Sequence, residues 1–223
     1  MSLLKPILSA MTIAVFTLGS SFASETITKE EAINFVKQFI DDGKRICQEQ
    51  TDVNQEPSLK IKNEFYSFLE SKLSSGAVRT ILGRNILSNV KEKGMNADDY
   101  IKSFTPDFIR YVVKFYSSPE KMKIFQKATY DDKTAKSEVS PDGKMVQVKI
   151  AFSYDDKNAL VQFYVIKENG GLKLDDLGLE GISQKGNQVS EIRAFFSAPD
   201  KGKGDAKVFL DWFTAEMSKY FAR

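Results

Sequence analysis

The sequence contains no histidine and a single cysteine, and both shortages narrow the chemistry open to the protein. Histidine is the commonest general base, the usual activator of a nucleophile and the commonest metal ligand. Hydrolytic and metal-dependent catalysis are therefore disfavoured. Cys47 has no second cysteine with which to form an intramolecular disulfide. It falls on the apolar side of a predicted helix, so we expect a small buried side chain and not a reactive thiol.

Charge of one sign is not in excess, and no long hydrophobic run follows residue 18. The 32 basic and 30 acidic residues are mixed along the chain, which gives no indication of nucleic-acid binding. No later run approaches the ~20 apolar residues of a membrane-spanning helix. Adjacent aspartates occur in several places, but neighbours in a strand point to opposite faces and the others are typical of turns and helix ends. We predict no metal site, no cofactor and no nucleic-acid partner.

The first 23 residues have the organisation of a secretory signal peptide. Lys5 is the only charge before an apolar stretch at 7–18, and Ser21-Phe22-Ala23 fits the small-residue cleavage pattern. The apolar stretch is too short to span a bilayer. We predict cleavage near Ala23, which leaves a mature domain of residues 24–223 in an exported compartment. The alternative is an amphipathic N-terminus that stays attached.

The period of the hydrophobic pattern changes along the chain from helical to strand-like and back to helical. Thr28 and Glu31 form a capping box, and Asn96, Ser183 and Asp205 are candidate N-caps. The segments predicted as helices are 28–48, 58–73, 77–90, 96–116, 184–197 and 206–221. The segments predicted as strands are 122–126, 136–139, 145–154, 159–166 and 172–179. This order predicts a single α+β domain with a curved, antiparallel or mixed sheet covered by helices.

Two residues interrupt the predicted helices. Gly83 lies in the middle of the third helix, where glycine costs up to ~1 kcal/mol relative to alanine. That cost suggests close packing against a neighbouring element. Pro106 lacks a backbone N–H, so we expect it to kink the helix at 96–116 or to divide it.

Residues 170–196 read as a strand that turns sharply into a helix, and the rest of the chain is organised around this corner. Leucines alternate along the strand, and Ser183 is placed to cap the helix. Gly178 and Gly181 allow the backbone to bend or to approach another surface where a Cβ would interfere.

Phenylalanine is abundant, with 17 copies against one tryptophan. An antiparallel sheet with one apolar face must be covered, and large aromatic side chains either fill the space beneath the helices or line a cavity there. The pattern alone favours an ordinary packed core over a cavity.

The corner carries a resemblance to a known family. The segment 174–183, LDDLGLEGIS, resembles a strand motif of the MlaC (toluene-tolerance) family, and the matching residues are Asp176, Glu180, Gly181, Ile182 and Ser183. Three helical segments, 81–84, 104–116 and 189–195, are similar to further motifs of that family in the same order. The resemblance covers nearly the whole mature chain.

Members of that family are periplasmic phospholipid carriers, and the resemblance implies the same role here. It implies a glycerophospholipid as cargo, with no other cofactor. The expected partners are an outer-membrane lipoprotein complex and an inner-membrane ABC transporter with an MCE-domain subunit. The expected role is to maintain lipid asymmetry of the outer membrane. The resemblance also implies acyl chains held in an apolar pocket between sheet and helices, with the head group near solvent.

Fifteen apolar residues are our hypothesis for the lining of that pocket, and we expect about half of them to contact lipid while the others form solid core. A charged residue in place of Phe108 or Val112 is expected to abolish lipid recovery. The lining residues on predicted helices are Val78, Leu82, Ile86, Phe104, Phe108, Val112 and Phe115. Those on predicted strands are Val148, Ile150, Phe152, Phe163 and Val165, and those of the corner are Leu179, Ile182 and Phe195.

Two other functions stay open. The first is an enzyme on a related cone-shaped α+β scaffold that acts on a small apolar substrate. It requires a buried acid, for which Asp176 and Glu180 are the candidates. The second is a non-catalytic adaptor of the cell envelope, which predicts a closed core and no extractable lipid.

Overall fold

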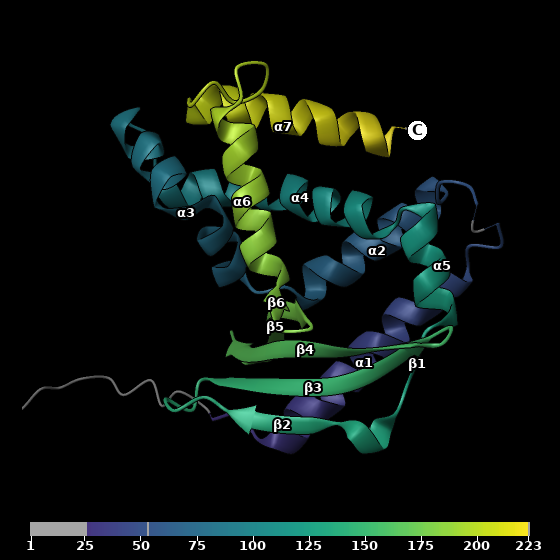
Figure 1. Cartoon of the computed structure of the whole chain (residues 1–223). Helices are drawn as coiled ribbons and strands as arrows, with labels where there is room; N and C mark the ends of the chain where they lie inside the picture. Colours follow the sequence, from purple (N-terminus) through teal and green to yellow (C-terminus); the bar gives the residue numbers. More distant parts are fainter. Residues whose placement is uncertain (1–25, 53, 223) are drawn as a thin grey trace, which may run out of the picture.

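The computed structural model describes residues 26–52 and 54–222, so the predicted signal peptide lies outside the described residues. Four long helices come first, a sheet follows, and two helices end the chain (Figure 1). The helices are α1 (Lys29–Gln48), α2 (Leu59–Lys72), α3 (Ser75–Glu92), α4 (Ala97–Tyr116), α5 (Pro119–Lys127), α6 (Gln184–Ser197) and α7 (Ala206–Phe221). The strands are β1 (Thr129–Tyr130), β2 (Lys136–Val139), β3 (Met145–Tyr154), β4 (Lys157–Glu168), β5 (Gly171–Leu179) and β6 (Ile182–Ser183), with a 3₁₀ turn at Asp132–Thr134.

The helices begin where the sequence places capping side chains. Thr28 and Glu31 form the predicted capping box, in which each side chain accepts a hydrogen bond from the other's backbone N–H. Asn96, Ser183 and Asp205 cap α4, α6 and α7 as predicted. Each satisfies an N–H group that has no partner inside its own helix.

The sheet is antiparallel between all the strands described, in the order β1-β3-β4-β5-β6, with β2 also paired to β3. Asn169 and Gly170 both adopt positive φ and close the β4–β5 hairpin, as expected of an Asn-Gly turn. Strand β3 alternates as predicted, with Val146, Val148 and Ile150 fully buried on the face that α1 covers. The predicted α+β architecture is confirmed.

The core is divided into two apolar clusters. The helical cluster joins buried side chains of α2, α3, α4, α6 and α7 with the C-terminal end of α1. The sheet cluster packs the rest of α1 against one face of β3, β4 and β5. In Figure 1 the helical layer stands beyond the β5–β6 edge of the sheet, and α1 runs behind the strands. Cys47 is buried, and burial raises the pKa of its thiol to about 12, so it is the inert side chain that was expected.

Three local predictions need correction or refinement. Residues 122–126 are not a strand but part of α5, because Ser118 and Pro119 together start a helix whose first position favours proline. Gly83 does not mark close packing, since nothing lies within 4 Å of the place where its Cβ would be. It is instead a kink in α3, with φ 65° and ψ 176°. Pro106 does not divide α4, which continues through it as one helix.

Candidate functional site

The two clusters meet along a boundary that we call the seam. Phe39 of α1 and Leu73, at the end of α2, are only partly buried and pack against both clusters. The Phe39 ring lies 4.9 Å from that of Phe68 on α2 and 6.2 Å from that of Phe163 on β4, measured between centroids. Aromatic contacts thus cross from the helices to the sheet. These contacts across the seam are made by apolar side chains.

Polar contacts close the seam at one end, where α2 passes into α3. Leu73 forms an isolated parallel bridge with Leu174 of β5, and the Ser74 N–H donates to the Leu174 carbonyl at 3.0 Å. The Ser74 hydroxyl also donates to Asp175 at 2.8 Å. Lys185 at the start of α6 pairs with the other oxygen of the same carboxylate at 2.5 Å. Hydrogen bonds and an ion pair therefore hold this end of the seam together.

A second set of polar contacts joins α5 to the C-terminal part of α1. The Gln126 amide donates to the carbonyls of Cys47 at 2.6 Å and Gln50 at 2.9 Å. Lys44 donates to the carbonyl of Ala128 at 2.6 Å. These contacts hold α5 on the helical side of the seam, since the C-terminal end of α1 and Met122 of α5 both belong to the helical cluster.

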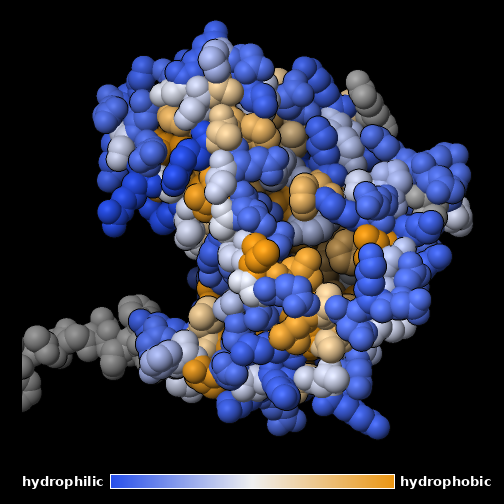
Figure 2. Space-filling model, in the orientation of Figure 1, coloured by the Kyte–Doolittle hydropathy of each residue, from blue (hydrophilic) through white to orange (hydrophobic). Residues whose placement is uncertain are grey.

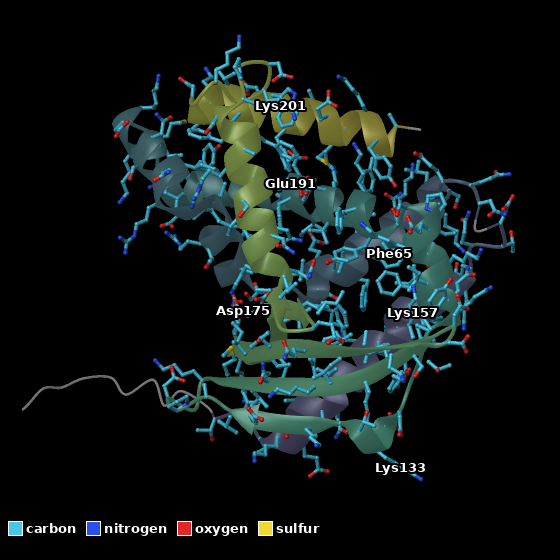
Figure 3. All side chains as sticks on the ribbon, in the orientation of Figure 1. Phe65, Lys133, Lys157, Asp175, Glu191 and Lys201 are labelled. Carbon is cyan, nitrogen blue, oxygen red and sulfur yellow. The ribbon has the colours of Figure 1, made fainter. Side chains whose placement is uncertain are left out.

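Apolar side chains are exposed where the seam reaches the surface. Figure 2 shows orange side chains gathered around a hollow between α4, α5, the lower half of α6 and the β4–β6 corner. Phe125 on α5 is 39% exposed, and Leu179 and Ile182 at the corner are 44% and 59% exposed. Figure 3 places Phe65 of α2 in the space behind this opening. We call the exposed apolar residues around this hollow the mouth of the seam.

A tight turn at the corner sets the positions of the two exposed apolar side chains, Leu179 and Ile182. Glu180 and Gly181 both have positive φ, 51° and 81°, as in a two-residue hairpin, and Leu179 and Ile182 pair directly across it. The Glu180 carboxylate accepts the N–H of Leu160 at 2.6 Å, which binds the turn to β4. The turn therefore presents an apolar pair at the mouth.

Gly178 allows close approach, as the sequence predicted. A Cβ there would lie 2.6 Å from the side-chain oxygen of Gln162 on the neighbouring strand. Gln162 therefore lies directly over the strand at this point. Any larger residue would have to displace the Gln162 side chain.

The acids considered for catalysis have structural partners. Asp176 accepts hydrogen bonds from the Ser183 hydroxyl at 2.6 Å and from the backbone N–H groups of Leu177 and Lys185 at 2.7 and 2.9 Å. It thereby fixes the start of α6 against β5. Asp176 and Glu180 both hold the corner in shape, so their hydrogen bonds explain them without a catalytic role.

Tyr116, at the end of α4, connects the mouth with the corner. Its ring contacts those of Phe115 and Phe125, with centroids 5.0 and 6.2 Å away. Burial, and then the charge on Asp176, raise the pKa of the Tyr116 hydroxyl to about 12. The phenol stays neutral at physiological pH and adds no charge to the mouth.

The fifteen predicted lining residues fall into four places. Six lie buried in the helical cluster: Val78, Leu82, Ile86, Phe104, Phe108 and Val112. Five belong to the sheet cluster, namely Val148, Ile150, Phe152, Phe163 and Val165, of which Phe152 is only partly buried. Leu179 and Ile182 are at the mouth, and Phe115 and Phe195 line a separate groove described next. Their contact with lipid stays a prediction.

Two surface grooves accompany the seam. One, of about 710 Å³, lies between α1 and α2 and is lined mainly by charged and polar side chains. The other, of about 530 Å³, lies between α4, α6 and α7 and is lined by aromatic and charged side chains. This second groove could not be predicted from the sequence, because its walls come from helices far apart in the chain and no local motif joins them.

The described part of the chain offers little else for chemistry. Across residues 26–52 and 54–222, no three histidine, cysteine, aspartate or glutamate side chains are grouped so as to hold a metal ion. Within the same ranges, no helix combines the length and the apolar character needed to cross a membrane.

Comparisons with known proteins agree with the fold. No family model matches the sequence, and no curated protein matches it. The fold is nevertheless one already seen in a solved structure. A solved structure with this fold is the phospholipid-binding protein from Ralstonia solanacearum, determined in complex with a phospholipid. The two chains superpose with a TM-score of 0.64 and 13% sequence identity, over 86% of this chain and 99% of the other. The likeness at this identity establishes the shared fold.

Proposed function

We propose that the protein binds a glycerophospholipid and carries it through the periplasm, with the acyl chains inserted into the seam. The observation that carries the proposal is the combination of the fold with the exposed apolar mouth. A protein of the same fold was solved with a phospholipid bound. Here the seam opens at exposed apolar side chains, and a gathering of this kind marks a ligand-binding groove or an interaction site.

The energetics of cargo exchange suit an apolar seam. Two acyl chains carry ~30 methylenes, and each contributes ~0.8 kcal/mol on leaving water, which gives ~24 kcal/mol in total. A bilayer already supplies this amount. A carrier that loads and unloads must match the bilayer without greatly exceeding it. A site closed mainly by apolar adhesion meets this requirement, because lipid replaces the contacts that it breaks.

The proposed route joins the two membranes. In this proposal the signal sequence directs the chain to the periplasm, where the protein exchanges lipid with an outer-membrane lipoprotein complex and an inner-membrane MCE-type ABC transporter. The resulting transport maintains lipid asymmetry of the outer membrane. The near-neutral charge of the chain, +2 over its full length, fits brief contacts with both partners.

Native mass spectrometry of protein purified from its own cell envelope tests the proposal. We expect a mass increment equal to one phospholipid, released as the intact lipid on activation of the ion. Protein stripped of lipid should regain the increment after incubation with phospholipid vesicles. A protein that carries no lipid and extracts none from vesicles contradicts the proposal and favours the adaptor. Turnover of a small apolar substrate, lost on replacing Asp176 and without lipid binding, favours the enzyme.

A further inference from the structure

The groove between α4, α6 and α7 has aromatic walls. The Phe195 ring of α6 lies 6.3 Å from that of Tyr111 on α4 and 5.6 Å from that of Trp212 on α7, in edge-to-face arrangements. Phe213 contacts Tyr111 at 5.9 Å. In Figure 3, Glu191 on α6 and Lys201 in the loop after α6 lie on the side of α6 toward α4 and α7. The volume of about 530 Å³ lies within the range of small-molecule sites.

A buried hydroxyl without a partner lies at the base of this groove. Tyr111 is 7% exposed, and its hydroxyl forms no hydrogen bond with any described residue. Burial raises the pKa of Tyr111, and the Glu191 carboxylate beside the hydroxyl raises it further, both as a hydrogen-bond acceptor and as a charge, although the two groups do not reach full hydrogen-bond geometry. A buried hydroxyl of this kind is costly unless a ligand satisfies it.

Lysine side chains lie over the aromatic walls. Lys121 is 2.9 Å from the centroid of the Phe115 ring, and Lys201 is 4.3 Å from that of Phe195. Lys121 also donates a hydrogen bond to the Phe115 carbonyl at 2.8 Å, and neither lysine forms an ion pair within the described ranges. Lys114 adds a third positive charge to the lining. Cations stacked on rings without a carboxylate partner are available to an anionic group.

The loop after α6 fixes Lys201 in place. Gly202 passes so close to α6 that a Cβ there would lie 2.3 Å from the Phe196 carbonyl oxygen. The Gly202 N–H donates to the Phe195 carbonyl at 3.0 Å, and that of Lys203 donates to Ala198 at 2.9 Å. The lysine is therefore presented from a rigid loop.

The groove carries both signs of charge. Two glutamates also line it, and Glu216 is already paired with Lys219 at 2.5 Å. Glu191 remains as an acceptor beside the Tyr111 hydroxyl. A ligand that combines a phosphate with an ammonium group satisfies these charges better than a simple anion does.

The groove adjoins the mouth of the seam. Phe115 lines the groove, and the next residue, Tyr116, contacts Phe125 at the mouth. Tyr111 and Tyr116 are five residues apart on α4, which corresponds to ~7.5 Å along the helix axis. One lipid molecule is long enough to occupy both sites.

We propose that the α4–α6–α7 groove binds the phosphate-bearing head group of the lipid whose acyl chains occupy the seam. The inference rests on the proposed function and extends it to head-group selection. The Tyr111 hydroxyl donates to a phosphate oxygen, and Lys121 and Lys201 supply positive charge. Glu191 receives the ammonium group of a zwitterionic head group such as phosphoethanolamine.

The test compares lipids that differ only in the head group. Lipid-free protein is incubated with vesicles that contain phosphatidylethanolamine and diacylglycerol in equal amounts and with identical chains, and the bound lipids are counted by native mass spectrometry. We expect the wild-type chain to recover phospholipid over diacylglycerol by about tenfold, the ratio that ~1.4 kcal/mol of selective binding provides.

The variant Tyr111→Phe isolates the hydroxyl. Its selectivity should fall about fivefold, while its thermal midpoint stays unchanged or rises, because the hydroxyl has no protein partner to lose. The double variant Lys121→Met, Lys201→Met should lose the remaining preference and still bind diacylglycerol. Lys207→Met, at an exposed position of α7 outside the groove lining, is the matched control and should keep the preference.

The outcomes separate the inference from the function. If no lipid of either kind binds, the proposed function fails. If the wild-type chain binds both lipids equally, or if Tyr111→Phe and the double variant keep full selectivity, the function stands and the inference is wrong. If inorganic phosphate raises the thermal midpoint of lipid-free protein while the wild-type chain shows no preference between the two lipids, the groove is a site for free anions and the head-group inference is overturned.

Discussion

The helical cluster and the sheet cluster are built differently, and the difference locates the site. Phe104, Phe209 and Phe213 of the helical cluster are fully buried, and their ring centroids lie 5.0 to 5.8 Å apart. In the sheet cluster Phe152 and Leu177 are only partly buried, even though they face the same side as fully buried neighbours. Helices from several directions close the first cluster, whereas α1, together with Leu73 at the end of α2, covers the second. The uncovered apolar surface therefore lies on the sheet side of the seam.

The largest effect is expected at the centre of the helical cluster. Replacing Phe104 with alanine removes a ring that stacks on Phe108 and Phe213, with centroids 5.9 and 5.0 Å away. We expect a loss of about 3–5 kcal/mol in the free energy of unfolding, measured by denaturant titration. A loss below about 1 kcal/mol would show that this cluster is loosely packed or already hollow.

The tight packing of the helical cluster makes its buried residues unsuitable for testing lipid contact by substitution. Phe108 and Val112 are 2% and 5% exposed, so a charge at either position would be buried without a partner and would unfold the helical cluster. Loss of lipid in such a variant cannot be separated from loss of the fold. Substitutions at the mouth make that separation.

The second effect is expected at the mouth. The double variant Leu179→Asp, Ile182→Asp should recover at least tenfold less lipid from vesicles, since each side chain contributes about 1.5–3 kcal/mol when lipid buries it fully. Its unfolding free energy should change little, because both residues are exposed.

Val208→Asp is the matched control for the mouth. Val208 is an apolar residue of similar size that is 39% exposed. It lies on α7, which does not contribute to the mouth. Its lipid recovery should equal that of the wild-type chain. Equal losses in the control and the mouth variant would mean that the effect is not local to the mouth.

The sequence predicted most elements because each has a local signal. Capping residues and apolar periodicity were enough for α1 and α7, and the Asn169-Gly170 turn was enough for the β4–β5 hairpin. The prediction of a strand at residues 122–126 was wrong because the pattern around Met122 and Ile124 fits a short strand as well as a helix. The helix start at Ser118-Pro119 decides the matter.

The candidate site was less predictable for a physical reason. Apolar periodicity identifies which side chains turn inward, but not which of two clusters they enter. Phe108 and Phe163 are equally apolar in sequence, yet one enters the helical cluster and the other the sheet cluster. The corner was found because the residues that shape it are consecutive. The Tyr111 groove was not found, because Tyr111 and Trp212 come together only through tertiary packing.

The third effect is expected at the kink of α3, which turns both halves of that helix toward the helical cluster. At φ 65° and ψ 176°, Gly83 occupies a region that other residues avoid, so Gly83→Ala should cost about 1–3 kcal/mol of unfolding free energy. Gly76→Ala is the control within the same helix, since its backbone has negative φ and its Cβ would meet only ordinary contacts at 3.9 Å. It should be neutral or stabilising. Equal effects would contradict the role assigned to the kink.

The smallest effect is expected at the start of α7. Hydrogen bonding to Lys93, followed by that to the backbone N–H of Val208, lowers the pKa of Asp205. Because the pKa of Asp205 is lower in the folded protein than its ordinary value of 3.8, the ionised carboxylate stabilises the fold at pH values above 3.8. This stabilisation is lost as the pH falls through the pKa of the folded state. Asn keeps the cap without the charge, so Asp205→Asn should be slightly less stable at pH 6 and equal to the wild-type chain near pH 2. Thermal midpoints across that range measure the difference, and a gap that persists unchanged at pH 2 would contradict the assignment.

Photo-crosslinking from the acyl chain tests the central claim most directly. A phospholipid with a diazirine near the end of one chain is loaded onto the protein, irradiated, and the modified residues are identified by peptide mass spectrometry. We expect adducts on the two sides of the seam, at Phe39 and Leu73 on the helices and at Phe163 and Leu177 on the sheet. Adducts confined to the groove between α1 and α2, or spread evenly over the surface, would show that the chains do not enter between the two clusters.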